Sequence, residues 1–212
     1  MARVYSVKEI YYTLQGEGAN AGRAAVFLRF SGCNLWSGQE DDRAEAICSF
    51  CDTDFVGTDG PGGGKFVSPQ KLAEAVSEKW KQKGGRKFVV CTGGEPLLQL
   101  DIPLIRALHE KGFEIAIETN GTIPAPPGID WICVSPKAEA PLRQISGDEL
   151  KLVFPQDGLD PAQFENLSFK HFFLQPMDCK DLEKNIQLAV EYCLQHPRWR
   201  LSLQMHKLLG LP

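Results

Sequence analysis

The feature that most constrains the fold is a repeated pattern in which a run of β-branched and aromatic residues ends in a short polar motif. Such runs predict β-strands, and three segments with apolar residues on one face predict helices between some of them. Strands that alternate with helices favour a parallel β/α sheet. Strands are expected at residues 4–12, 24–30, 87–91, 113–118, 131–134, 149–154, 171–174 and 198–204, and helices beginning at residues 69, 102 and 182.

The chain of 212 residues is long enough to bury a good core, and residues 1–212 are expected to form one domain. A complete eight-fold β/α barrel is usually longer, and several links between the predicted strands are too short to carry a helix. The fold class is therefore predicted to be α/β, an open, incomplete parallel β/α barrel with some helices lost. Residues 37–46 predict a solvated loop or short helix, and the glycine-rich residues 56–65 predict a flexible connector.

The polar motifs that end the strands are expected to meet at one edge of the sheet. In a parallel barrel the loops at the carboxyl ends of the strands form the active face. A single motif of this kind is explained by turn chemistry, but several that converge on one rim predict an active site. The motifs lie at residues 31–33, 92–95, 118–120, 135–137, 175–178 and 204–206.

Composition excludes several classes of partner. The formal net charge is −4 and the isoelectric point is near 5.6, with Lys and Arg spread along the chain, so direct contact with nucleic acid is not expected. The first residues lack the apolar run of a signal peptide, and no stretch is long enough to span a bilayer. We therefore expect a cytoplasmic protein that does not engage a membrane.

Seven cysteines without an export signal favour reduced thiols over disulfides. Cys33, Cys48 and Cys51 form a group, with fourteen residues between the first two and Phe50 just before the last. A structural zinc site normally takes four ligands, whereas a [4Fe-4S] cluster held by three thiolates keeps one iron open. The cysteines alone favour zinc and iron–sulfur equally. The other four are expected to be structural or idle: Cys91, Cys133, Cys179 and Cys193.

A second motif favours iron–sulfur: the strand at 87–91 runs into Thr-Gly-Gly-Glu-Pro at 92–96. Three cysteines ending in Cys-x-aromatic-Cys, followed by a strand and Gly-Gly-Glu, resemble the radical S-adenosylmethionine (SAM) superfamily. The long insert between the first two cysteines departs from the usual spacing. Together with L-Q-G-E-G at 14–18, C-D-T at 51–53, S-P-K at 135–137, Q-P-M-D at 175–178 and the last proline, it resembles the 7-carboxy-7-deazaguanine synthases over nearly the whole chain.

The resemblance implies roles for the cofactor-binding residues. Cys33, Cys48 and Cys51 would hold a [4Fe-4S] cluster whose open iron binds SAM. Phe50 would lie beside the adenine, and Gly94 and Glu95 would meet the methionyl amine. The remaining SAM contacts would come from Ser135, Pro136, Lys137, Gln175, Pro176, Met177 and Asp178.

The resemblance also implies a substrate, 6-carboxy-5,6,7,8-tetrahydropterin, which would lose ammonia in a radical ring contraction that leads towards queuosine. Thr53 would bind a Mg²⁺ ion that also meets substrate oxygens, because Mg²⁺ takes hard oxygen ligands. Arg29 suits the substrate carboxylate and Glu17 the donors of the pterin edge. The substrate would contact Leu14, Gln15, Gly16, Glu17, Arg29, Thr92, His206 and the carboxylate of Pro212.

The expected partners are an electron donor such as a flavodoxin and, in a homodimer, a second copy of the chain. Two other functions remain open at this stage. One is a radical activase that abstracts hydrogen from a protein partner, and the other is a non-enzymatic zinc-binding module.

Overall fold

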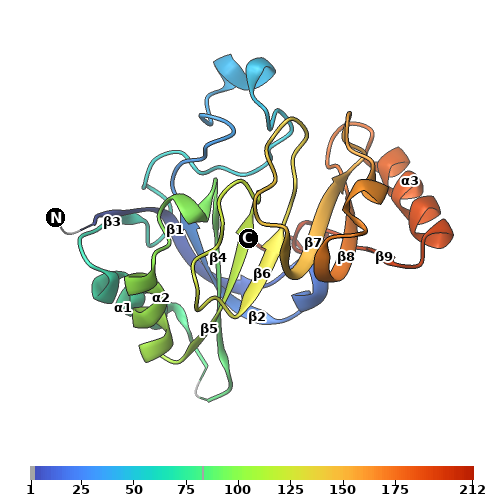
Figure 1. The fold of residues 1–212 in the computed structure, drawn as a ribbon. Coiled ribbons are helices and arrows are strands. Elements are labelled where there is room, and N and C mark those ends of the chain that lie inside the picture. Colours follow the sequence, from blue (N-terminus) through green and yellow to red (C-terminus); the bar gives the residue numbers. More distant parts are fainter. Residues whose placement is uncertain (1–2, 83) are drawn as a thin grey trace.

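The computed structural model describes residues 3–82 and 84–212. Its strands form one nine-stranded sheet in the order β3-β1-β2-β4-β5-β6-β7-β8-β9 (Figure 1). Neighbouring strands from β2 to β9 are parallel, as in the predicted open, incomplete β/α barrel. The strands are β1 (Tyr5–Leu14), β2 (Ala24–Phe30), β3 (Gly64–Phe66), β4 (Lys87–Gly93), β5 (Phe113–Thr119), β6 (Trp131–Val134), β7 (Ser146–Phe154), β8 (Ser168–Pro176) and β9 (Trp199–Leu201).

The helices begin at the three predicted points. The Ser68 side chain caps α1 (Pro69–Lys79) by accepting a hydrogen bond from the Lys71 amide, and the Asp101 side chain caps α2 (Ile102–Glu110) in the same way. Both helices have proline in the first turn, where no backbone N–H is needed. The third predicted helix is α3 (Leu182–Gln195).

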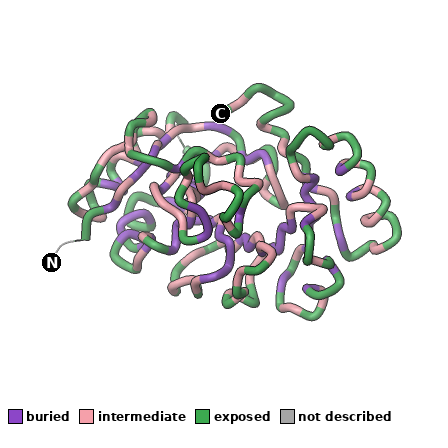
Figure 2. Tube along the Cα trace, turned by 90° about the horizontal axis from the view of Figure 1, so that it is seen from above, coloured by how far each residue is buried: buried purple, intermediate pink, exposed green. Residues whose placement is uncertain are grey.

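Two apolar clusters fill the space between the sheet and these helices. The first packs α1 and α2 against β1, β2, β4 and β5, and the second packs α3 against β7, β8 and β9. The links from β5 to β6 and from β6 to β7 carry no helix, which agrees with the expectation of lost helices. The other face of the sheet holds a small cluster of Ala25, Phe88, Val90 and Ala116. Figure 2 shows buried positions through the middle of the fold and exposed ones on the surrounding loops.

Three details differ from the sequence prediction. β1 pairs antiparallel with both β2 and β3, so the sheet begins with antiparallel strands at one edge. The glycine-rich residues 56–65 are not simply a connector: the Ile10 amide donates to the Pro61 carbonyl at 2.8 Å and the segment leads into β3. The last predicted strand stops at Leu201, and a short helix, α4 (Met205–Leu209), follows it.

The residues expected to form a solvated loop or short helix contain a 3₁₀-helix, Glu40–Glu45, which confirms that prediction. Among the helices described, none has both the length and the apolar character needed to cross a bilayer.

Candidate active site

A cavity of about 400 Å³ opens at the carboxyl ends of the strands, where the sequence predicts the active site. Every candidate site residue lines it except Glu95 and Pro136. The candidates that line it are Leu14, Gln15, Gly16, Glu17, Arg29, Cys33, Cys48, Phe50, Cys51, Thr53, Thr92, Gly94, Ser135, Lys137, Gln175, Pro176, Met177, Asp178, His206 and Pro212.

The three grouped cysteines lie on what we call the cluster loop, residues 33–53. Their sulfur atoms face one cavity but do not all lie within 4.8 Å of one another. Three thiols around one cavity would suit a [4Fe-4S] cluster, of which they would hold three irons and leave the fourth open.

The thiols also interact with one another. A hydrogen bond with Cys48 lowers the pKa of Cys51 to about 6 and raises the pKa of Cys48. The Cys33 sulfur accepts a hydrogen bond from the Leu35 amide at 3.4 Å, although burial raises the pKa of its thiol.

The Gly-Gly-Glu-Pro turn packs tightly against the start of the cluster loop. A Cβ atom on Gly94 would collide with the Gly32 carbonyl and come within 2.6 Å of the Cys33 Cβ, so only glycine allows this approach. The Glu95 amide donates to the same Gly32 carbonyl at 3.0 Å. The turn therefore fixes where the first cysteine stands.

Glu95 itself is fully buried beneath this turn. Its carboxylate accepts hydrogen bonds from the Leu97 amide (3.0 Å), the Thr119 hydroxyl (2.8 Å) and the Asn120 amide (2.8 Å). Burial raises the pKa of Glu95. Its carboxylate joins the loops after β4 and β5, and its expected contact with the methionyl amine of SAM stays a prediction.

The motif after β6 forms a second wall of the cavity. The Lys137 ammonium donates to the Ser135 carbonyl at 2.7 Å and to the Ser135 hydroxyl at 2.6 Å. Burial lowers the pKa of Lys137. Pro136, between them, is buried and holds the backbone but does not line the cavity.

Arg29 stands on a third wall, formed by β1 and β2. Its Nε donates to Glu9 at 2.8 Å and its Nη2 to the Tyr11 hydroxyl at 2.9 Å. Thr92 is its register partner on β4. Because Glu9 and Tyr11 take two donors, the guanidinium is held in place with further N–H groups left for a ligand.

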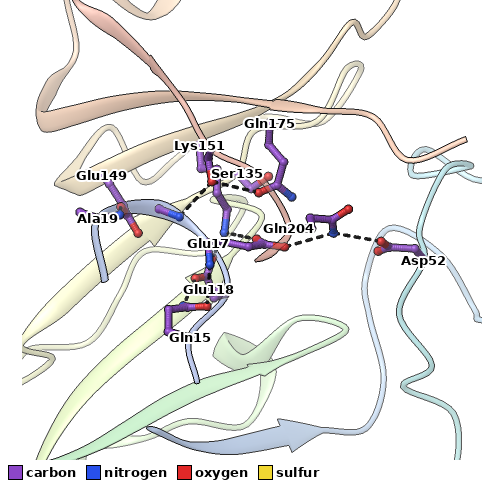
Figure 3. Close-up of polar contacts among 12 residues, drawn as sticks. Gln15, Glu17, Ala19, Asp52, Glu118, Ser135, Glu149, Lys151, Gln175 and Gln204 are labelled. Atoms are coloured by element: carbon purple, nitrogen blue, oxygen red, sulfur yellow. Dashed lines mark hydrogen bonds and ion pairs between the residues drawn. The ribbon is translucent and has the colours of Figure 1, made fainter. Parts of the chain in front are cut away.

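Glu17 and three residues to which the sequence analysis gave no role form a group that we call the pocket floor: Glu17, Glu118, Glu149 and Lys151 (Figure 3). The Lys151 ammonium pairs with Glu17 at 2.5 Å and with Glu118 at 2.8 Å. Glu17, Glu118 and Lys151 line the cavity. The alternation of apolar and charged residues in β7 could have indicated this group. Leu150 and Leu152 pack on the face that α3 covers, so Glu149 and Lys151 point to the opposite face.

The C-terminal helix closes one side of the cavity. The Met205 amide donates to the Gly16 carbonyl at 3.0 Å, and a Cβ on Gly16 would collide with His206. The Lys207 ammonium pairs with both Asp52 and Asp178 at 2.5 Å. This ion pair joins the cluster loop to the loop after β8, and neither Asp52 nor Lys207 was singled out in the sequence.

Known proteins resemble this chain along almost its whole length. Residues 43–139 match the Radical SAM superfamily. The chain is 66% identical over 208 residues to 7-carboxy-7-deazaguanine synthase from Caulobacter vibrioides, covering 98% of this chain and 99% of that one. Identity to the enzyme of the same name from Burkholderia multivorans is 60%, with the same coverage. The crystal structure of QueE from Escherichia coli is similar in fold, with a TM-score of 0.67 and 28% identity over 96% of this chain and 95% of that one.

Proposed function

Because the chain belongs to the 7-carboxy-7-deazaguanine synthase family of radical SAM enzymes, we propose that its cavity holds the cofactors and the pterin side by side. The enzyme converts 6-carboxy-5,6,7,8-tetrahydropterin to 7-carboxy-7-deazaguanine with loss of ammonia, a step of queuosine biosynthesis. Family membership excludes the zinc module and the protein-directed activase. The observation that supports the site is that three thiols, one arginine and several carboxylates line a single cavity.

The cluster and SAM, when bound, supply the one-electron chemistry that removes a hydrogen atom from the substrate. We assign the cluster to Cys33, Cys48 and Cys51. Gly94 lines the cavity and packs on Gly32 next to the first cysteine, so a methionyl group bound near the cluster would lie against this turn. Adenine and ribose contacts are assigned to Phe50, Ser135, Pro136, Lys137, Gln175, Pro176, Met177 and Asp178, and the methionyl amine contact to Gly94 and Glu95.

We place the pterin over the opposite part of the cavity. Arg29, already oriented by Glu9 and Tyr11, would take the substrate carboxylate through its free N–H groups. Glu17 would accept from the pterin N–H groups. The other substrate contacts in the proposal are Leu14, Gln15, Gly16, Thr92, His206 and Pro212.

Mg²⁺ is part of the proposal, with Thr53 as its protein ligand. Thr53 lines the cavity beside the last cysteine, and its hydroxyl is the hard oxygen donor that Mg²⁺ takes. Thr53→Ala should lower turnover and weaken its dependence on Mg²⁺ while SAM binds as before. Thr53→Ser keeps the oxygen and is the matched control. If Thr53→Ala responds to Mg²⁺ like the wild type, the assignment is wrong.

Further proposals concern the domain organisation of the enzyme, its electron donor, its oligomeric state and its location in the cell. The continuous nine-stranded sheet supports a single domain of residues 1–212. Family chemistry requires a one-electron donor, for which a flavodoxin is our candidate. We also propose a homodimer in the cytoplasm.

Anaerobic turnover tests the central proposal. The protein, reconstituted with iron and sulfide and supplied with SAM, Mg²⁺ and a chemical reductant, should convert carboxytetrahydropterin into a product with the mass of 7-carboxy-7-deazaguanine. Omitting SAM is the control. Reconstituted protein that cleaves SAM without forming this product would contradict the substrate assignment.

A further inference from the structure

We propose that Lys151 positions Glu17 and Glu118 as a pair of hydrogen-bond acceptors that select the amine-bearing edge of the substrate ring. The inference deepens the proposed function and rests on it. It assigns the positioning of Glu17 and Glu118 to Lys151, a residue that neither the motifs nor the comparisons single out.

The geometry gathers three chain segments at one ammonium group. Lys151 stands on β7, Glu17 follows β1 and Glu118 is near the end of β5. The Lys151 side chain is only 4% exposed, yet its two partners lie at 2.5 and 2.8 Å. Since both carboxylates reach the same nitrogen and both line the cavity, they present their remaining oxygen lone pairs to one small region.

Other polar groups hold the two carboxylates from the sides. Gln15 donates its Nε2 hydrogen to Glu118 at 3.0 Å, and Gln204 donates to Glu17 at 3.1 Å. These contacts fix the orientation of each carboxylate without supplying a second positive charge. Among the described residues, the carboxylates of the pocket floor outnumber its single ammonium.

Glu149 has a different task in the pocket floor. Its carboxylate accepts a hydrogen bond from the Ala19 amide at 2.8 Å and packs against Gly18. It therefore anchors the loop that carries Glu17. This leaves Glu17 and Glu118 as the carboxylates facing a ligand, with one lysine between them.

The two carboxylates differ in ionisation: burial raises the pKa of Glu118, whereas the pKa of Glu17 is lowered. Burial by itself would raise the pKa of Glu17, but attraction to Lys151 and the hydrogen bond with it outweigh burial and lower that pKa. A carboxylate kept ionised can only accept hydrogen bonds. At Glu17 the pocket floor therefore favours ligands that present N–H groups and disfavours ligands that present lone pairs.

The aminopyrimidinone ring of a pterin carries adjacent N–H donors on its exocyclic amine and ring nitrogen. Two oriented carboxylates can accept from both. A ring without the exocyclic amine would leave a buried carboxylate without a partner, which is costlier than a lost surface contact. Discrimination between these two rings is the property we assign to the pocket floor.

A metal site is the alternative interpretation of the pocket floor, because ligand atoms of Glu118, Cys133 and Glu149 lie within 4.8 Å of one another. The Lys151 ammonium already supplies a cation to Glu118, and Glu149 is engaged by a backbone amide. Both observations favour a lysine-centred pair of acceptors over an ion site.

The test compares Lys151→Met with Lys170→Met in the cluster-loaded enzyme with SAM bound. Lys170 lies on the neighbouring strand β8 and pairs with Asp148 at 2.7 Å, but its side chain is 70% exposed. Dissociation constants are measured for carboxytetrahydropterin and for its analogue that lacks the 2-amino group. SAM affinity and iron content are measured in parallel.

Lys151→Met should weaken binding of the pterin roughly ten- to a hundredfold, the effect of losing an oriented charged acceptor, and change binding of the analogue far less. The preference of the wild type for the amino compound should therefore collapse. Lys170→Met should keep that preference. Equal losses for both ligands, or no loss for either, would overturn the assignment, since a purely structural lysine would not distinguish them.

Glu118→Gln keeps the test decisive if Lys151→Met fails to fold. This variant removes one charge and preserves shape, so it should lower the preference for the amino compound about tenfold. An unchanged preference would refute the role of the pair. Wild-type turnover in the same preparation separates this failure from failure of the proposed function: if the wild type makes no 7-carboxy-7-deazaguanine, the proposed function is wrong, whatever the variants bind.

Discussion

The middle of the cluster loop, around Arg43, and the pocket floor are held in opposite ways. In the cluster loop, Arg43 pairs with Glu40 at 2.6 Å, donates to the carbonyls of Ser49 (2.9 Å) and Cys51 (3.0 Å), and lies 4.0 Å from the Trp36 ring. All of these partners lie within eight residues of Arg43 along the chain.

The pocket floor is held by partners that are distant in sequence. Lys151 and Glu17 are 134 residues apart, and Glu149 and Ala19 are 130 apart. Their strands must pair in register before these groups meet. The comparison indicates that the contacts of the middle of the cluster loop form locally, whereas the geometry of the pocket floor depends on the whole sheet.

The largest effect is expected when a cysteine of the cluster loop is replaced. Cys33→Ala, Cys48→Ala and Cys51→Ala should each abolish the [4Fe-4S] cluster and all turnover, because two thiolates cannot hold the cube with one iron free. Iron and sulfide analysis after reconstitution measures this. Cys193→Ala, outside the cavity, should keep the cluster. Equal iron content in all four variants would contradict the assignment.

Breaking the pocket floor should instead lower global stability. Glu149 is 1% exposed, and Glu149→Ala removes a charged acceptor from the Ala19 amide. We expect the free energy of unfolding to fall by about 2 kcal/mol, measured by urea denaturation under anaerobic conditions. Glu191→Ala on the exposed face of α3 is the control. A urea midpoint equal to that of the control would show that the contact between Glu149 and the Ala19 amide does not stabilise the fold.

Loosening the cluster loop should affect cofactor retention more than stability. Arg43→Met removes the donors to Ser49 and Cys51, so iron should be lost to a chelator severalfold faster while the urea midpoint stays nearly unchanged. Arg106→Met on α2 is the control for removing an exposed arginine. If Arg43→Met lowers the urea midpoint as much as Glu149→Ala does, the contrast between the two regions fails.

The smallest effect concerns His206, which belongs to the C-terminal helix α4, packs on Gly16 and lines the cavity. Burial lowers the pKa of His206 below its ordinary value of 6.5 despite attraction by Glu17. The unfolded chain then binds more protons, so the contribution to stability is present above pH 6.5 and is lost as the pH falls through the folded-state pKa.

Wild-type protein should therefore lose a few tenths of a kcal/mol more than His206→Gln between pH 7.5 and 5.5. Paired urea titrations at several pH values measure the difference. If the free energies of unfolding of the two proteins change equally with pH, titration of His206 does not contribute to stability.

Local patterns predicted much of the fold. The Ser68-Pro69 start of α1 and the Gly-Gly turn after β4 depend on residues next to one another, so they could be recognised without the fold. The parallel arrangement of β2 to β9 was predicted from the alternation of strands and helices. The antiparallel pairing of β1 with β2 was missed, although the link of residues 15–23 is shorter than a parallel crossover normally needs.

The sequence by itself determined the three cysteines, the motifs after the strands and the rim on which they meet, because each is a short-range pattern and parallel strands end on the same side. Only the tertiary structure decided that Glu95 is buried under its turn, that Lys207 bridges Asp52 and Asp178, and that Lys151 gathers Glu17 and Glu118. A charge in a strand does not reveal its partner. The partner is chosen when the sheet closes and burial forces each ionised group to find an opposite charge or a hydrogen bond.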